Sequence, residues 1–368
     1  MASGPLERSA LARTPLALGT GHRRRRRTPW PMAALAVAGM TAILVLQLGG
    51  SAPAPTLRLA APVRATVPGT VPALPWPATG QSALAVPDAG VLLASGPEQP
   101  VPVASLTKMM TAYVVLKDHP LDPSAQGPTV VMTQTDVQDA AADAAGGDTS
   151  VPVTAGEGLS ERQLLDGLLV HSAADFADAL ARWDAGTIEA FVGKMNATGT
   201  ALGLRQTHYV DPNGIDPGDV STAADQLRVA RAGMAVPAFA AVVAQPAIVE
   251  PGAGTLSNYV PIVGTHGVVG VKSGFTQAAN ACVVLAAVRQ VQGRQVVVMA
   301  AVTGHQGVNA IYGADAAALG LIDAATGALG VQTFVPAGQR AATVSAPWVN
   351  RTAVGVTSSG VTTVVWPG

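Results

Sequence analysis

Apolar and polar residues follow strand-like and helix-like periods in a definite order between about residues 81 and 330. Short apolar runs at 83–86 and 91–94 flank Pro87-Asp88-Ala89-Gly90, a sequence that favours a hairpin. Helical patterns cover 105–116, 160–170, 187–202 and 222–234, and the sequence at 211–214 predicts a turn before the last of them. The remaining patterns predict strands at 259–263, 267–272, 281–288 and 295–302 and a final helix from about 308 to 319 or beyond.

This order of elements predicts an α+β fold. Strands come from the beginning and the end of the region and helices come from its middle, so we expect an antiparallel sheet built from both ends with helices packed on it. Residues 331–368 have the pattern of a few short strands. They are expected to form a β-rich C-terminal extension.

Near the N-terminus, residues 32–48 form an apolar run of 17 residues, which is long enough for a helix to cross a bilayer. Five consecutive arginines at 23–27 precede it, and the positive-inside rule places such a cluster in the cytoplasm. We therefore expect a basic cytoplasmic tail at 1–29 and a single-pass transmembrane signal-anchor at 30–50. Ala52-Pro53-Ala54 resembles a cleavage site, and cleavage there would release a secreted protein.

Residues 51–80 are rich in Pro, Ala and Thr and have no helical or strand period, which is typical of a semi-extended linker. The linker would hold a folded domain at 81–330 off the membrane surface. The expected location of that domain is the cell membrane on its extracytoplasmic side. A core helix at 32–48 is the alternative, but a core helix rarely follows five arginines.

The net charge of −1 hides an asymmetry along the chain. Seven of the 22 basic residues and one of the 23 acidic ones lie in residues 1–28, and residues 29–50 have no charge. The remaining 15 basic and 22 acidic residues give residues 51–368 a net charge of −7. Nucleic-acid binding needs a basic face on a folded domain, so the sequence excludes that class of function.

The chain has a single cysteine, Cys282, which excludes an intramolecular disulfide and a multi-thiolate zinc site. It lies in an apolar strand pattern, where a buried and unreactive thiol is expected. His208, His266 and His305 have no ligand spacing. The sequence thus predicts neither a metal site nor a cofactor.

Only four of the basic residues are lysines, and Lys108 follows Ser105 by three positions at a predicted helix start. This spacing places both side chains on one helix face. A neutral amine can take the proton of a serine hydroxyl and make it a nucleophile, whereas arginine cannot lose its proton. The motif alone is weak, because an N-cap serine beside a solvated lysine has the same spacing.

Two further motifs accompany it. Lys272-Ser273-Gly274-Phe275-Thr276 ends a predicted strand and offers a cation, hydroxyls and a glycine that lets a ligand lie close to the backbone. His171-Ser172-Ala173-Ala174-Asp175 ends an apolar helix between the other two motifs. Three such elements in this order match the motif set of penicillin-recognising serine enzymes.

The chain resembles the serine-type D-alanyl-D-alanine carboxypeptidases, which are low-molecular-mass penicillin-binding proteins of peptidase family S11. The resemblance runs from about residue 80 to about residue 329 and implies a β-lactamase/transpeptidase-like form of the α+β fold. The stretches that carry it are 103–112, 167–172, 191–196, 202–204, 211–215, 221–223 and 270–274.

The resemblance also implies roles for individual residues. Ser105 would attack the penultimate D-alanine carbonyl of a peptidoglycan stem peptide that ends in D-Ala-D-Ala, with Lys108 as general base and Ser172 as a proton relay. Lys272 would supply positive potential, and Ser273 and Thr276 would hold the terminal carboxylate. The backbone N–H groups of Ser105 and Phe275, next to Gly274, would form the oxyanion hole. β-Lactam antibiotics would acylate the same serine.

One departure puts this activity in doubt. The second motif of the family is S-x-N, and Ala174 stands where the asparagine would bind substrate and help to position the lysine. Losing such a contact costs about 1–3 kcal/mol. A catalytically weakened or non-catalytic homologue that binds penicillin or peptidoglycan is therefore an open alternative. A class A-like β-lactamase is another, with Glu189 as the nearest glutamate after the second motif.

Overall fold

The computed structural model of the protein describes residues 40–41, 54–59, 67–96, 98–346 and 351–367. Contacts divide the chain into two compact units. One is drawn from Met1–Arg58 and Ala342–Val354, and the other from Leu59–Ala341 and Gly355–Gly368. The second unit contains all the motifs described above.

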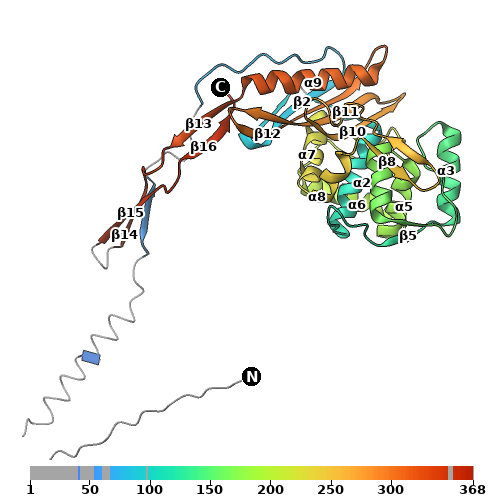
Figure 1. Ribbon diagram of the computed structural model, residues 1–368, viewed down its shortest axis with the longest axis horizontal. Coiled ribbons are helices and arrows are strands. Elements are labelled where there is room, and N and C mark those ends of the chain that lie inside the picture. The colour runs from blue at the N-terminus through green and yellow to red at the C-terminus, as the bar shows by residue number, and fades with distance from the viewer. Residues whose placement is uncertain (1–39, 42–53, 60–66, 97, 347–350, 368) are drawn as a thin grey trace, which may run out of the picture. The chain divides into compact units, whose positions relative to one another are not determined.

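The centre of the second unit is a five-stranded antiparallel sheet (Figure 1). Its strand order is β10 (Val268–Thr276), β11 (Asn280–Val291), β12 (Arg294–His305), β2 (Gln81–Val86) and β3 (Val91–Ala94). The short helix η1 (Pro87–Ala89) and Gly90 connect the last two strands. The predicted sheet from both ends of the region is confirmed, and the strand patterns at 267–272, 281–288 and 295–302 match β10, β11 and β12.

The two faces of the sheet have different coverings because successive side chains of a strand point to opposite faces. On β12, Val298, Ala300 and Val302 pack in one apolar cluster with α9 (Ala310–Ala328). Met299 and Ala301 belong to a second cluster with the other helices. Figure 1 shows α9 on one side of the sheet and the helical region on the other. The domain is therefore built of three layers.

The helical layer contains more helices than the sequence predicts. The patterns at 105–116, 160–170, 187–202 and 222–234 correspond to η2 with α2, α4 with the π-helix η3, α6 and α7. Three helices without a prediction, α3, α5 and α8, are rich in alanine or short. The bounds are η2 (Ala104–Leu106), α2 (Thr107–Asp118), α3 (Gln134–Gly146), α4 (Glu161–Asp166), η3 (Gly167–His171), α5 (Ala174–Ala185), α6 (Ile188–Ala201), α7 (Ala223–Met234) and α8 (Pro237–Val243).

The predicted strand at 259–263 is wrong, because this segment forms turns after the hairpin of β8 (Ala247–Glu250) and β9 (Gly254–Ser257). Pro261 has no N–H to donate to a ladder. The Tyr259 N–H donates to the Val170 carbonyl in η3, and the Val263 N–H donates to Val260 within the segment. Its buried valines, Val260 and Val263, produced the apolar pattern that resembles a strand.

The remaining strands form small sheets. Within the second unit, β4 (Val101–Pro102) pairs with β7 (Val220–Ser221), β5 (Thr129–Val131) with β6 (Gly158–Ser160), and β13 (Gly330–Val335) with β16 (Val361–Val365). A further three-stranded sheet has the order β1 (Thr56–Leu59), β14 (Arg340–Ala346) and β15 (Arg351–Val356). The strands at 330–365 agree with the predicted β-rich extension. Strand β1 lies inside the predicted linker at 51–80, so the expectation of no strand there is wrong; this short segment is extended because it pairs with the distant β14, which no local period indicates.

The predicted signal-anchor at 30–50 lies outside the described residues, apart from two of its positions. Within the described part of the chain, no individual helix has the length and apolar character that a membrane span requires. The bent pair α7 and α8 meets the requirement by length and composition only.

Candidate active site

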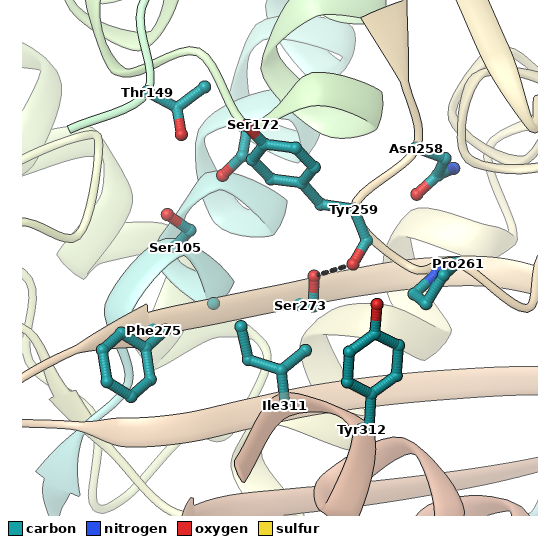
Figure 2. Close-up of a pocket in the computed structure, with 11 residues that line it drawn as sticks. Ser105, Thr149, Ser172, Asn258, Tyr259, Pro261, Ser273, Phe275, Ile311 and Tyr312 are labelled. Atoms are coloured by element: carbon teal, nitrogen blue, oxygen red, sulfur yellow. Dashed lines mark hydrogen bonds between the residues drawn. The ribbon is translucent and has the colours of Figure 1, made fainter. Parts of the chain in front are cut away.

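A cavity of about 390 Å³ lies where the β10 strand, the short helix η2 before α2, the end of η3 and the start of α9 meet. Its volume is in the range of small-molecule sites. Figure 2 shows the hydroxyl groups of Ser105, Thr149 and Ser172 directed into one space beside β10. The lining residues are Ser105, Thr149, Ser172, Asn258, Tyr259, Pro261, Ser273, Gly274, Phe275, Ile311 and Tyr312.

Ser105 lies in η2, immediately before α2. The preceding Ala104 has a positive φ of 51°, a conformation that costs a non-glycine residue free energy and recurs at active sites. Gly214 packs against the Ala104 carbonyl so closely that a Cβ would lie 2.0 Å from its oxygen. The Val103 N–H donates to the Asp219 carbonyl. The turn that presents Ser105 is thus fixed from two sides by the loop at 211–219.

Lys108 is the neighbour of Ser105 that the helical spacing predicts. Its Nζ lies 3.0 Å from Ser105 Oγ and 2.5 Å from the Asn213 carbonyl oxygen. The side chain is 1% exposed. Burial lowers the pKa of Lys108 to about 8, with the carboxylates of Asp211 and Asp178 opposing the shift. With this pKa roughly a tenth of the amine is neutral at pH 7 and about half at pH 8, which makes Lys108 able to accept the Ser105 proton.

Ser172 is the residue that ends the π-helix η3, and its φ of 71° is also positive. The Ala174 N–H, at the start of α5, donates to the Thr149 carbonyl at 2.8 Å, which holds the Thr149 loop beside Ser172. Ala174 itself is 1% exposed and contributes no polar side chain. Ser172 and Thr149 therefore provide the hydroxyl groups on this wall of the cavity.

Strand β10 forms the opposite wall. Lys272 is buried and its Nζ donates to the Ser273 carbonyl at 2.8 Å. Burial, and then the charge of Lys108, lower the pKa of Lys272 well below its usual range. Ser273 Oγ donates to the Tyr259 carbonyl at 2.6 Å, a contact that Figure 2 shows. The backbone therefore occupies both polar groups, and a bound carboxylate would have to compete for them.

Most of the predicted site residues come together at the cavity, but Lys272, which is buried in β10 beside Ser273, and Thr276 do not line it. Ser105, Ser172, Ser273, Gly274 and Phe275 line the cavity, and Lys108 lies directly behind Ser105. Thr276 does not line it, because its hydroxyl accepts the Ala279 N–H at 3.1 Å where β10 turns into β11. The proposed β-lactamase glutamate, Glu189, is exposed in the first turn of α6 and does not line the cavity either.

Sequence reasoning missed several lining residues, among them Thr149, Tyr259 and Tyr312. None belongs to a motif, and none is close in sequence to the residue it meets. The Asp211-Pro212-Asn213-Gly214 turn was marked by its sequence, but its contact with Lys108 crosses 105 positions of the chain.

A buried lysine in contact with a serine, in a cavity between a helical layer and an antiparallel sheet, defines an active-site serine hydrolase. Residues 78–303 match the family model described as D-alanyl-D-alanine carboxypeptidase, Peptidase_S11. The chain therefore belongs to the S11 family of serine-type D-alanyl-D-alanine carboxypeptidases.

Individual relatives agree with this assignment. The chain is 38% identical over 220 residues to the D-alanyl-D-alanine carboxypeptidase DacB2 of Mycobacterium tuberculosis, covering 57% of this chain and 70% of the relative. The crystal structure of the Streptomyces K15 DD-transpeptidase matches with a TM-score of 0.59 and 26% identity, over 70% of this chain and 98% of that one. DacD from Francisella tularensis has a similar fold, with a TM-score of 0.63, 19% identity and coverage of 83% and 84%.

Proposed function

We propose that this chain is a membrane-tethered carboxypeptidase that removes the terminal D-alanine from peptidoglycan stem peptides through a Ser105 acyl-enzyme. The observation that carries the proposal is the buried Lys108 amine, 3.0 Å from Ser105 Oγ in an open cavity. A lysine with a pKa near 8 can take up the serine proton and later release it.

The reaction would proceed in two steps. Ser105 Oγ forms a bond to the carbonyl carbon of the penultimate D-alanine while Lys108 takes its proton, and the developing negative charge lies near the N–H groups of Ser105 and Phe275. The C–N bond to the terminal D-alanine then breaks, and its nitrogen receives a proton through Ser172. In the second step water attacks the ester carbonyl carbon and gives a proton to Lys108. The C–O bond to Ser105 then breaks, and Lys108 returns that proton to Ser105 Oγ as the shortened peptide leaves.

The tether is supported by the sequence alone. The arginine cluster at 23–27 and the apolar run at 32–48 predict a cytoplasmic N-terminus and an extracytoplasmic catalytic domain. Stem peptides of the cell wall lie on that side of the membrane, so substrate and active site would share a compartment. A protease-protection assay on membrane vesicles tests this orientation, since external protease should digest the domain only in vesicles that expose their outer face.

The direct test of activity is D-alanine release from a peptide that ends in D-Ala-D-Ala, using the full chain in detergent. We expect release by the wild type and none by Ser105→Ala. A wild type that acquires a covalent penicillin label on Ser105 and releases no D-alanine would support the non-catalytic alternative. If Ala174→Asn then restored release, the missing amide would be the reason.

A further inference from the structure

Ala174 and Asp178 lie one turn apart on the same face of α5. Ala174 is buried and has no polar group to offer to its surroundings. Asp178 directs its carboxylate to Asn213, whose Nδ2 lies 3.3 Å from Oδ1 and 3.4 Å from Oδ2. A polar group on this helix face is therefore present, but it stands one turn later than the second motif.

Asn213 connects α5 with the catalytic lysine. Its backbone carbonyl accepts the hydrogen bond from Lys108 Nζ at 2.5 Å, and its side-chain oxygen accepts the Ile215 N–H at 2.9 Å. Asp211 accepts the backbone N–H groups of Asn213, Gly214 and Asp216, which fixes the course of the turn. The contact from Asp178 is the link between this turn and α5 among the hydrogen bonds of the described residues.

We propose that Asp178 is a positioning residue for Lys108: acting through the Asn213 side chain, it holds the carbonyl group that keeps the lysine amine beside Ser105. This inference rests on the proposed function of Lys108 as the base of Ser105. Asp178, one turn further along α5, would thus give Lys108 part of the support that Ala174 does not give.

The charged groups around Asp178 and Lys108 determine how the acylation rate should depend on pH. Asp178 is faced by Arg182 on its own helix, by Asp139 and Asp143 of α3 and by Asp211. Lys108 is faced by Asp211, Asp178, Asp143 and Asp148, and by Lys272 of β10. The carboxylate of Asp178 raises the pKa of Lys108, opposing the effect of burial. Burial raises the pKa of Asp178 itself to about 7, so its charge acts on Lys108 mainly above that pH. Its removal should therefore move the upper part of the acid limb, between about pH 7 and pH 8, to lower pH, because neutral amine persists there.

The test is the rate constant for acylation by a fluorescent penicillin, measured from pH 5 to 10 on the full chain in detergent. We expect Asp178→Ala to lower the rate at pH 8 about ten- to hundredfold, as for a lost hydrogen bond to a charged group. Asp178→Asn keeps the size of the side chain and an acceptor oxygen. We therefore expect its plateau rate at high pH to be within about threefold of the wild type and its acid limb to lie at lower pH. Asp323→Ala is the control: it removes an acid of α9 that pairs with Arg289 and is not among the groups that face Asp178 or Lys108, so it should change neither the plateau rate nor the acid limb.

A double-mutant cycle with Asn213→Ala separates a positioning role from a structural one. If Asp178 acts through the Asn213 side chain, the double variant should be no slower than the slower single variant. The proposal would be overturned if the rate losses of the two single variants multiply in the double variant. An Asp178→Ala variant with the wild-type rate and acid limb would overturn it as well. A lower melting temperature with an unchanged acid limb in Asp178→Asn would overturn it too.

A wild type that is not acylated would count against the proposed function and would leave this inference to be decided by structure. In that case a crystal structure of Asp178→Ala is the measurement. Displacement of the Asn213 carbonyl from Lys108 Nζ supports the positioning role. Persistence of the 2.5 Å contact contradicts it.

Discussion

Gly274 of β10 lies against the backbone amide of Ser105, and a Cβ on Gly274 would be 2.7 Å from that nitrogen. Such a distance is below any normal carbon–nitrogen contact, so the strand and the nucleophile turn approach closely because position 274 has no side chain. The Ser105 N–H is one of the two groups expected to stabilise the oxyanion. This contact therefore links the geometry of the Lys272-Ser273-Gly274 strand to that of the turn that carries Ser105.

Gly274→Ala should separate β10 from the nucleophile turn. We expect the rate of acylation by penicillin to fall at least about a hundredfold, in the range seen when one oxyanion donor is lost. Gly193→Ala in α6 is the matched control, because a Cβ there meets nothing within 4 Å and alanine favours a helix. Equal acylation rates for Gly274→Ala and the control would show that the close approach is not needed.

The second prediction concerns the pH dependence of acylation. The pKa of Lys108 is about 8, so the fraction of neutral amine should fall tenfold for each pH unit below that value. We expect the acylation rate constant to rise with pH and to level off above about pH 8. Lys108→Arg keeps a positive charge that cannot be released, and it should abolish acylation. Lys117→Arg, at an exposed position of α2, is the control.

The sequence predicted the sheet well because its central strands are long and nearly continuous in apolar residues. Strands β11 and β12 each have 12 residues and pair along most of their length, so local pattern and tertiary structure agree. The strand prediction for 259–263 was wrong for the opposite reason. Its valines are buried by contacts with distant elements, and an apolar run of that length does not distinguish a strand from a buried turn.

The residues of the active site likewise include some that could be predicted from the sequence and some that could not. Ser105 and Lys108 could be predicted together because three positions on a helix place two side chains on one face. Their support could not, since Asn213 and Asp178 reach Lys108 through contacts that span 105 and 35 positions of the chain. Tyr312 likewise enters the cavity only because α9 packs on the sheet with its first turn beside β10. Such contacts depend on tertiary structure, which no local pattern encodes.

Thr149 is expected to contact substrate, because its hydroxyl points into the cavity beside Ser105 and Ser172 (Figure 2). Thr149→Val keeps the shape and removes the hydroxyl. We expect kcat/KM for D-alanine release to fall about tenfold, as for a lost hydrogen bond of about 1.4 kcal/mol. Thr200→Val on the exposed side of α6 is the matched control, and a Thr149→Val variant that equals it would exclude a substrate contact.

Tyr312 should contribute to substrate affinity and not to the chemical step. The residue is 67% exposed at the start of α9, and Figure 2 shows its hydroxyl directed into the cavity toward Ser273. We expect Tyr312→Ala to raise KM several-fold with kcat nearly unchanged, since uniform binding is lost. Tyr312→Phe separates the two parts of the side chain. A KM like that of the wild type would assign the binding to the ring, and one like that of the alanine variant would assign it to the hydroxyl.

Buried acids should make the fold less stable as the pH rises. Burial raises the pKa of Glu250 to about 8, with the nearby charge of Asp166 adding to the shift, and burial raises that of Asp315 to about 7. Between the ordinary pKa of a carboxyl, about 4, and these values, the folded protein binds more protons than the unfolded chain. The free energy of unfolding therefore falls as pH rises through this window.

Glu250→Gln and Asp315→Asn remove the ionisation and should weaken this dependence. The unpartnered Oε2 of Glu250 and both carboxyl oxygens of Asp315 show that neither charge is compensated by a hydrogen bond or an ion pair at those atoms. We expect each amide variant to melt higher than the wild type at pH 8, by a few degrees for each 1 kcal/mol recovered, and to differ little at pH 5. Thermal unfolding followed by circular dichroism at the two pH values is the measurement. A wild type that melts higher at pH 8 than at pH 5, with variants that follow it in parallel, would contradict the assignment of these acids as the source of the dependence.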